Sequence, residues 1–314
     1  MRLRTPRERS THRTAGAAIL VASLTLAGCS IGETTHAGAT KGVVLKATAS
    51  IDAWGSIVAQ LGGTHVATTS IVGNPDTDPH DYEPTPGDAR AIASSDVFVE
   101  NGIGYDSWAA KVIAASPSVD RAVIDVGHVV GVPEGGNPHR WYSPTDVGTV
   151  ADAITSAFKR LDPADAAYFD AQRVAFETTG LAEYHRLIDD IRTRYSGTKV
   201  GASESIFAPL LDAVGLDLIT PPSFLKAISD GTDPNAADRT LIDTQISAHQ
   251  LEVYLFNVQN ATPDVTAQVD AARKAGIPVA TATETLSPRG ATFQDWQSTQ
   301  LRGLAAALRE ATGR

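Results

Sequence analysis

Short apolar runs alternate with amphipathic stretches along the chain from residue 43 onward. Runs typical of buried strands lie at residues 43–49, 66–72, 97–100 and 122–126. Segments with apolar residues at helical spacing lie at 54–61, 87–93 and 105–115. A repeated strand–helix order is typical of a mostly parallel sheet covered by helices. The pattern therefore predicts an N-terminal α/β lobe over residues 42–161.

Two helical stretches follow this lobe. The first covers residues 144–161. The second begins at Asp162-Pro163, where an N-cap residue precedes a proline at the first helical position, and runs to about residue 196. A helix of this length is unusual inside one globular domain, so residues 162–196 are predicted to link two domains.

The strand–helix pattern then restarts and predicts a C-terminal α/β lobe over residues 197–314. Its expected strands lie at residues 199–202, 216–220, 253–256 and 278–282. Its expected helices lie at 207–214, 239–249, 265–275 and 293–311. The predicted fold is two α/β lobes with mostly parallel sheets joined by one long rigid helix. Ligands of such sheets bind beyond the carboxyl ends of the strands, which places a site in the crevice between the lobes.

The first 29 residues have the layout of a secretory signal peptide. Five arginines precede an uncharged, mostly apolar stretch at 15–27, and the segment ends in Leu26-Ala27-Gly28-Cys29. This ending is similar to a bacterial lipobox, so Cys29 is predicted to be lipidated and residues 30–41 to be a flexible tether. The protein is then expected to be exported and anchored to the outer face of the cytoplasmic membrane. The alternative is a short membrane anchor with a chance cysteine.

The charge balance argues against a nucleic-acid partner. The chain has 26 Lys+Arg and 36 Asp+Glu, a formal net charge of −10. Removal of the signal peptide takes away five arginines and one glutamate and leaves an acidic protein. Such a surface disfavours polyanions and is compatible with capture of cations.

Four candidate metal ligands fall just beyond predicted strand ends, two in each lobe. Prolines stiffen the loops that carry the two histidines, in Asp78-Pro79-His80 and Asn137-Pro138-His139. The candidates are His80, His139, Glu204 and Glu284. Two imidazoles and two carboxylates suit borderline divalent ions such as Zn²⁺, Mn²⁺ or Fe²⁺.

Nearby charged residues complete the expected site. Asp81, Glu83 and Arg140 are candidates for orienting the imidazoles from outside the ligand set. Asp230 and Asp233 are rival carboxylates, although their Gly/Pro context first indicates a turn.

The two histidine motifs, the Ser203-Glu204-Ser205-Ile206-Phe207 turn and the long central helix together resemble the solute-binding lipoproteins of zinc and manganese ABC importers. The resemblance covers nearly all of the chain after the signal. It implies that His80 and His139 are the ligands from the first lobe, that Glu204 occupies the third position, and that Glu284 lies near the fourth. It also implies a carrier that hands its ion to a membrane permease driven by a cytoplasmic ATPase. The protein is expected to be a monomer.

The resemblance leaves the metal open. Many zinc-specific members have a long His- and acid-rich loop between the histidine motifs, whereas residues 127–138 are short and contain only His128. Glu204 is similar to the manganese-type ligand set and Glu284 to some zinc-type members. Zn²⁺ should bind such a site more tightly than Mn²⁺ in vitro on the Irving–Williams order, so affinity alone would not identify the physiological ion.

Two other functions compete with the carrier. A metallohydrolase would need a coordination position open to water, and neither H-E-x-x-H nor G-x-S-x-G occurs in the chain. A surface adhesin or interaction protein with a structural metal is the other alternative, and binding of partners with and without metal would separate it from the carrier.

Overall fold

The computed structural model describes residues 44–75 and 79–314. The predictions on the signal peptide, on Cys29 and on the tether at 30–41 lie outside these residues. Within the part of the chain that is described, no helix combines the length and the apolar character that a membrane span requires.

The first sheet is entirely parallel. Its strands are β1 (Leu45–Ile51), β2 (Val66–Val72), β3 (Val97–Glu100) and β4 (Ala122–Asp125), in the order β2-β1-β3-β4. In the register, Leu45 pairs with Val66, and Val97 pairs with both Ala47 and Ala122. Because every strand runs the same way, the loops after β2, β3 and β4 leave from one edge of the sheet.

The second sheet repeats this topology. Its strands are β5 (Lys199–Ala202), β6 (Asp217–Leu218), β7 (Val253–Asn257) and β8 (Val279–Ala282), in the order β6-β5-β7-β8 and all parallel. In the register, Val200 pairs with both Leu218 and Val253, and Tyr254 pairs with Val279. The α/β prediction with mostly parallel sheets is therefore confirmed.

Helices follow the strands in both halves of the chain. Those of the first half are α1 (Asp52–Gly62), α2 (Pro86–Ala93), α3 (Ser107–Ala115), α4 (Val126–Val130) and α5 (Pro144–Leu161). Those after β5 are α8 (Ala208–Val214), α9 (Pro222–Ser229), α10 (Ala236–Ser247), α11 (Pro263–Lys274) and α12 (Phe293–Thr312). The sequence did not predict α4 and α9, because both are short and lie in Gly- and Pro-containing segments. Asp125 caps α4 by accepting the His128 N–H at 3.1 Å, and α9 begins with Pro222 at its first position.

One continuous helix was expected over residues 162–196, and the structure corrects this prediction, because the segment is divided. The segment contains a short 3₁₀ turn η4 (Pro163–Asp165), then α6 (Ala166–Ala175), a π-helical turn η5 (Phe176–Gly180), and α7 (Ala182–Tyr195). The Leu181 N–H reaches the Phe176 carbonyl at 2.8 Å, the i→i+5 bond of a π turn. Two β-branched threonines and Gly180 at this point have low helix propensity, which accounts for the interruption. The lobe boundaries at 161 and 197 stay predictions.

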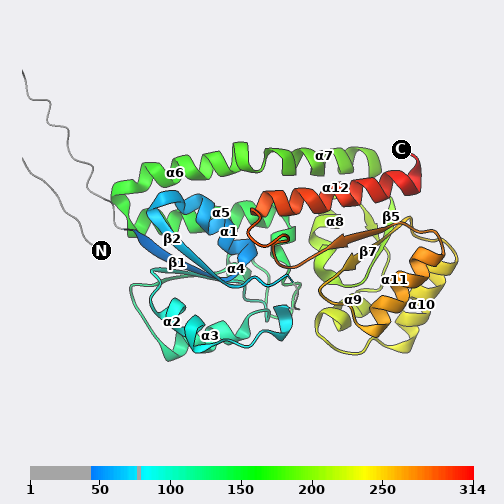
Figure 1. Ribbon diagram of the computed structural model, residues 1–314, viewed down its shortest axis with the longest axis horizontal. Helices are drawn as coiled ribbons and strands as arrows, with labels where there is room; N and C mark the ends of the chain where they lie inside the picture. Colours follow the sequence, from blue (N-terminus) through cyan, green and yellow to red (C-terminus); the bar gives the residue numbers. More distant parts are fainter. Residues whose placement is uncertain (1–43, 76–78) are drawn as a thin grey trace, which may run out of the picture. The chain divides into compact units, whose positions relative to one another are not determined.

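One cluster of buried apolar side chains extends over both sheets and the helices between them. It contains Ile51 of β1, Phe158 of α5, Ile191 of α7, Val200 of β5 and Leu308 of α12. Figure 1 shows α12 running beside α7, and the two helices are in contact. A shared core of this kind joins the two sheets firmly, because separating them would expose apolar surface to water.

Candidate metal centre

The loops at the carboxyl edges of the two sheets bring three predicted ligands together. His80 lies in the 3₁₀ turn η2 (Pro79–Asp81) after β2, His139 precedes the 3₁₀ turn η3 (Arg140–Tyr142), and Glu284 follows β8. One ligand atom from each lies within 4.8 Å of the other two. Glu284 Oε2 is 3.3 Å from His80 Nε2 and 3.5 Å from His139 Nε2. Loops of both sheets thus contribute ligands to one centre.

Glu204, the fourth predicted ligand, lies beside this group but not in it. Its carboxylate is completely buried, as is that of Glu284. The Asn257 side-chain amide donates to Glu204 Oε1 and to Glu284 Oε1, the latter at 2.8 Å. Asn260 donates to Glu204 Oε2 at 3.3 Å. One amide therefore links two buried carboxylates, and Glu204 is held next to the three converging residues.

His139 is oriented by Asn137. The Asn137 Nδ2 group donates to the Ser205 carbonyl at 2.7 Å, so its Oδ1 faces His139 Nδ1 at 3.0 Å as an acceptor. Nδ1 then holds the proton, and the Nε2 lone pair points toward Glu284. Burial lowers the pKa of His139, whereas the nearby Glu284 carboxylate acts to raise it. Among the described residues, buried His139 Nε2 has no hydrogen-bond partner, as a ligand atom awaiting a metal would have none.

Glu284 is held in its ionised form. Its burial acts to raise its pKa, but the contacts from His139 and His80 outweigh burial and hold the pKa of Glu284 well below the ordinary value. The Tyr105 hydroxyl donates to Glu284 Oε2 at 3.0 Å. A metal that binds here would have to displace any proton shared between Glu284 and an imidazole, so its binding is expected to depend on pH.

The residues expected to orient the imidazoles were Asp81, Glu83 and Arg140. Arg140 forms an ion pair with Asp146, with Nε 2.7 Å from Oδ2. Glu83 is exposed, and no bond from it to an imidazole is found among the described residues, whereas the Asp81 side chain lies outside the described part. Asp230, a rival carboxylate, is exposed and binds Lys226 at 2.7 Å.

Sequence reasoning missed the amides that organise the centre. Asn137 stands two residues before His139 in the same proline-stiffened step, and Asn257 is the last residue of β7. The position of Asn257 was the available signal, because a polar residue at the carboxyl end of a buried parallel strand lies where ligands bind.

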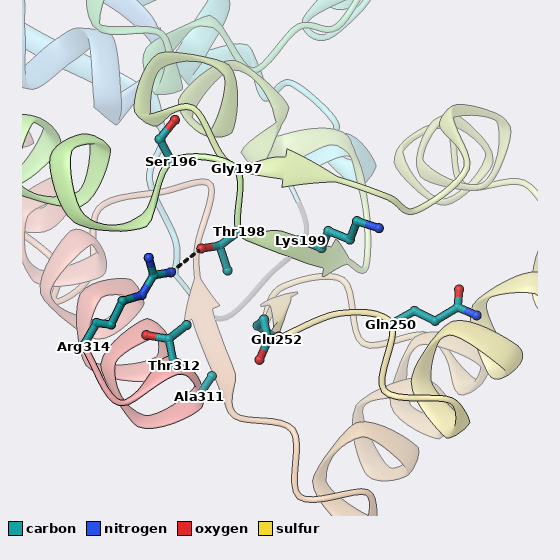
Figure 2. A pocket seen from close by; sticks show the side chains of 9 residues that line it. All are labelled: Ser196, Gly197, Thr198, Lys199, Gln250, Glu252, Ala311, Thr312 and Arg314. Carbon is teal, nitrogen blue, oxygen red and sulfur yellow. Dashed lines mark hydrogen bonds between the residues drawn. The ribbon is translucent and has the colours of Figure 1, made fainter.

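Two cavities of similar size lie in different places. One of about 580 Å³ borders the metal centre and is lined by His80 and Tyr105 among others. Figure 2 shows the other, of about 650 Å³, which is lined by residues at the start of β5 and the end of α12, including Lys199 and Arg314. This second cavity adjoins the amino edge of the second sheet, away from the converging ligands, so of these two it is the cavity beside His80 that borders the centre.

Known structures and sequences resemble the chain. A cadmium-bound periplasmic metal-binding protein from candidatus Liberibacter asiaticus superposes with a TM-score of 0.70 at 17% identity, over 84% of this chain and 99% of that one. At this identity the match shows the fold. The manganese-binding lipoprotein MntA of Halalkalibacterium halodurans is 27% identical over 208 residues, 64% of this chain and 67% of that protein.

A second curated relative extends this similarity to a zinc protein. The high-affinity zinc uptake system protein ZnuA of Bacillus subtilis is 22% identical over 204 residues, which span 57% of this chain and 60% of that protein. The profile of the family described as zinc-uptake complex component A, periplasmic, matches residues 48–307. This match covers both sheets apart from the first residues of β1, and it includes every residue of the centre; the chain therefore belongs to that family.

Proposed function

We propose that this protein captures one divalent transition-metal ion between its two sheets and delivers it to an ABC importer. The observation that carries the proposal is the convergence of His80, His139 and Glu284, from loops of both sheets, within 4.8 Å of one another. The family match and the manganese and zinc names of two relatives support it.

The proposed ligands are the two imidazole Nε2 atoms and the carboxylates of Glu284 and Glu204. Two buried carboxylates that share the Asn257 amide concentrate negative charge in a site with little water. A divalent cation would neutralise this charge, which makes ion binding strongly favourable. Nitrogen and carboxylate oxygen donors accept zinc, manganese or iron, and zinc is expected to bind most tightly of the three in vitro.

The arrangement suits a carrier better than a hydrolase. A catalytic zinc site has three protein ligands and an open position for water. The proposed set supplies four ligands, two from loops of each sheet. Movement of one sheet relative to the other would divide this set into halves and weaken the hold on the ion, so we infer that the permease releases the metal in this way.

The expected location, transport partners and oligomeric state follow from the same function. A lipid on Cys29 and the tether at residues 30–41 would keep the protein at the outer face of the cytoplasmic membrane, near a permease with its cytoplasmic ATPase. A monomer is sufficient, because one chain contains the whole proposed ligand set.

Elemental analysis of the purified protein after zinc loading and extensive dialysis tests the proposal. Wild type should retain about one tightly held equivalent, and His80→Ala and Glu284→Ala should each lose it. His185→Ala is the matched control, because His185 is a half-buried histidine beside a carboxylate, 3.8 Å from Glu177, near the start of α7 and outside the proposed ligand set. Retention of the same metal by both site variants, or no binding of zinc or manganese by wild type, would overturn the proposal.

A further inference from the structure

A second group of metal-binding side chains lies at the amino edge of the first sheet. His65 ends the 3₁₀ turn η1 (Gly63–His65) that follows α1, and Asp162 and Asp165 stand at the two ends of the turn η4 before α6. One ligand atom from each of the three lies within 4.8 Å of the other two. His65 Nδ1 is 2.7 Å from Asp165 Oδ2.

Asp162 gives this group a feature that an ordinary surface ion pair lacks. The residue is 8% exposed, and its Oδ2 atom is buried and accepts no hydrogen bond from the described residues. None of the ion pairs among those residues joins Asp162 or Asp165 to a lysine or an arginine. A buried carboxylate oxygen without a donor is costly, and a bound cation is one of the few ways to satisfy it.

The imidazole of this group is held in place by aromatic packing. The His65 ring stacks on Tyr168 at a centroid distance of 3.9 Å and an interplanar angle of 20°, and Phe169 packs edge-on at 6.1 Å. The Tyr168 hydroxyl accepts the Thr64 N–H at 3.0 Å, which fixes the stacking partner in turn. A ligand that is already oriented loses little conformational entropy when it binds a metal.

This group is separate from the first centre. His65 directly precedes β2, whereas His80 follows the carboxyl end of that strand. β2 has seven residues, and at about 3.3 Å per residue its two ends are roughly 20 Å apart. No residue is shared between the two groups.

We propose that His65, Asp162 and Asp165 form a second divalent-metal site. One imidazole and two carboxylates suit Zn²⁺ and related borderline ions, with water in the remaining coordination positions. The negative charge of two carboxylate ligands would balance the charge of such an ion. A metal here would tie the turn after α1 to the turn before α6, and so join the first sheet to the start of the α6–α7 segment.

The test uses the full-length protein with the first centre disabled by His139→Ala. Calorimetric titration of this variant with Zn²⁺ should reveal about one remaining equivalent, and zinc should raise its Tm. Adding Asp162→Asn, which preserves the shape of the side chain, should weaken this binding at least tenfold and remove the rise in Tm. His139→Ala with His185→Ala is the matched control and should bind as His139→Ala alone.

The outcomes separate the two proposals. The difference between wild type and His139→Ala reports the first centre, whereas the difference between His139→Ala and its Asp162→Asn derivative reports the second. The second site is ruled out if His139→Ala binds no zinc, or if neither Asp162→Asn nor Asp165→Asn changes what it binds. Asp165→Asn also serves if the Asp162 variant does not fold.

Discussion

Asp52 is a buried carboxylate whose titration should set much of the pH dependence of stability. It is the first residue of α1, and both of its oxygens accept the Leu286 N–H, at 3.3 and 3.1 Å. Leu286 lies two residues beyond Glu284, so this contact joins the first sheet's helix to a loop of the metal centre. Burial raises the pKa of Asp52 to about 7, although the N–H groups of Leu286 and Ala53 act to lower it.

The size and sign of the effect follow from this shift. The pKa rises from 3.8 to about 7 on folding, and each unit corresponds to about 1.4 kcal/mol. Between these two pH values the folded protein binds the proton more strongly than the unfolded chain does. The contribution of Asp52 to the free energy of unfolding is therefore largest below about pH 4. It falls as the pH rises from there through 7, by about 4 kcal/mol at most.

Asp52→Asn should remove this dependence, because the asparagine carbonyl can still accept the Leu286 N–H but cannot ionise. Urea unfolding of the metal-free protein between pH 4.5 and 8.5 measures the effect. The variant should exceed wild type in free energy of unfolding at pH 8, by a few kcal/mol, and the gap should shrink steadily toward pH 4.5.

A second, half-buried acid provides the control for this experiment. Burial, followed by repulsion from Asp106 and Asp125, raises the pKa of Glu100 to about 7 as well. Glu100→Gln therefore reports its own share of the wild-type profile, and the double variant should depend on pH less than either single variant. A gap between Asp52→Asn and wild type that stays constant with pH, or that widens on acidification, would refute the reasoning.

Three further predictions concern the metal centre. Asn137→Ala should weaken zinc binding by about 10–100-fold, because the His139 ring loses the acceptor that sets its tautomer, while circular dichroism should show an unchanged fold. Asn257→Leu should lower the unfolding free energy of the metal-free protein by about 2–4 kcal/mol, because two carboxylates lose a charge-assisted donor. The loss should be smaller with zinc bound, and equal losses in both forms would contradict this reasoning. Lowering the pH from 7 to 5 should weaken zinc binding at least tenfold in a competition assay with a chelator, because protons compete for the imidazole lone pairs, and a pH-independent affinity would argue against histidine ligands.

Local signals in the sequence predicted the elements and the residues that could bind a metal. Each strand end that carries a candidate was recognisable from an apolar run followed by a polar loop, and prolines marked the stiff loops of His80 and His139. The helical segment after Asp162 was recognised, but its π-helical interruption at Phe176–Gly180 was not, although two threonines and Gly180 at this point have low helix propensity.

Tertiary structure alone decided which candidates meet. The distance between His80 and Glu284, which are more than two hundred residues apart in the chain, depends on strand order and on how the two sheets pack. The role of Asn257 as a shared donor, and the position of Glu204 beside rather than within the group of three, depend on the register of β5 and β7. The grouping of His65 with Asp162 and Asp165 likewise arises where two turns from distant parts of the chain come together. Hydrophobic patterning determines each element because it acts over a few residues, whereas a binding site is set by contacts between distant segments that no local pattern contains.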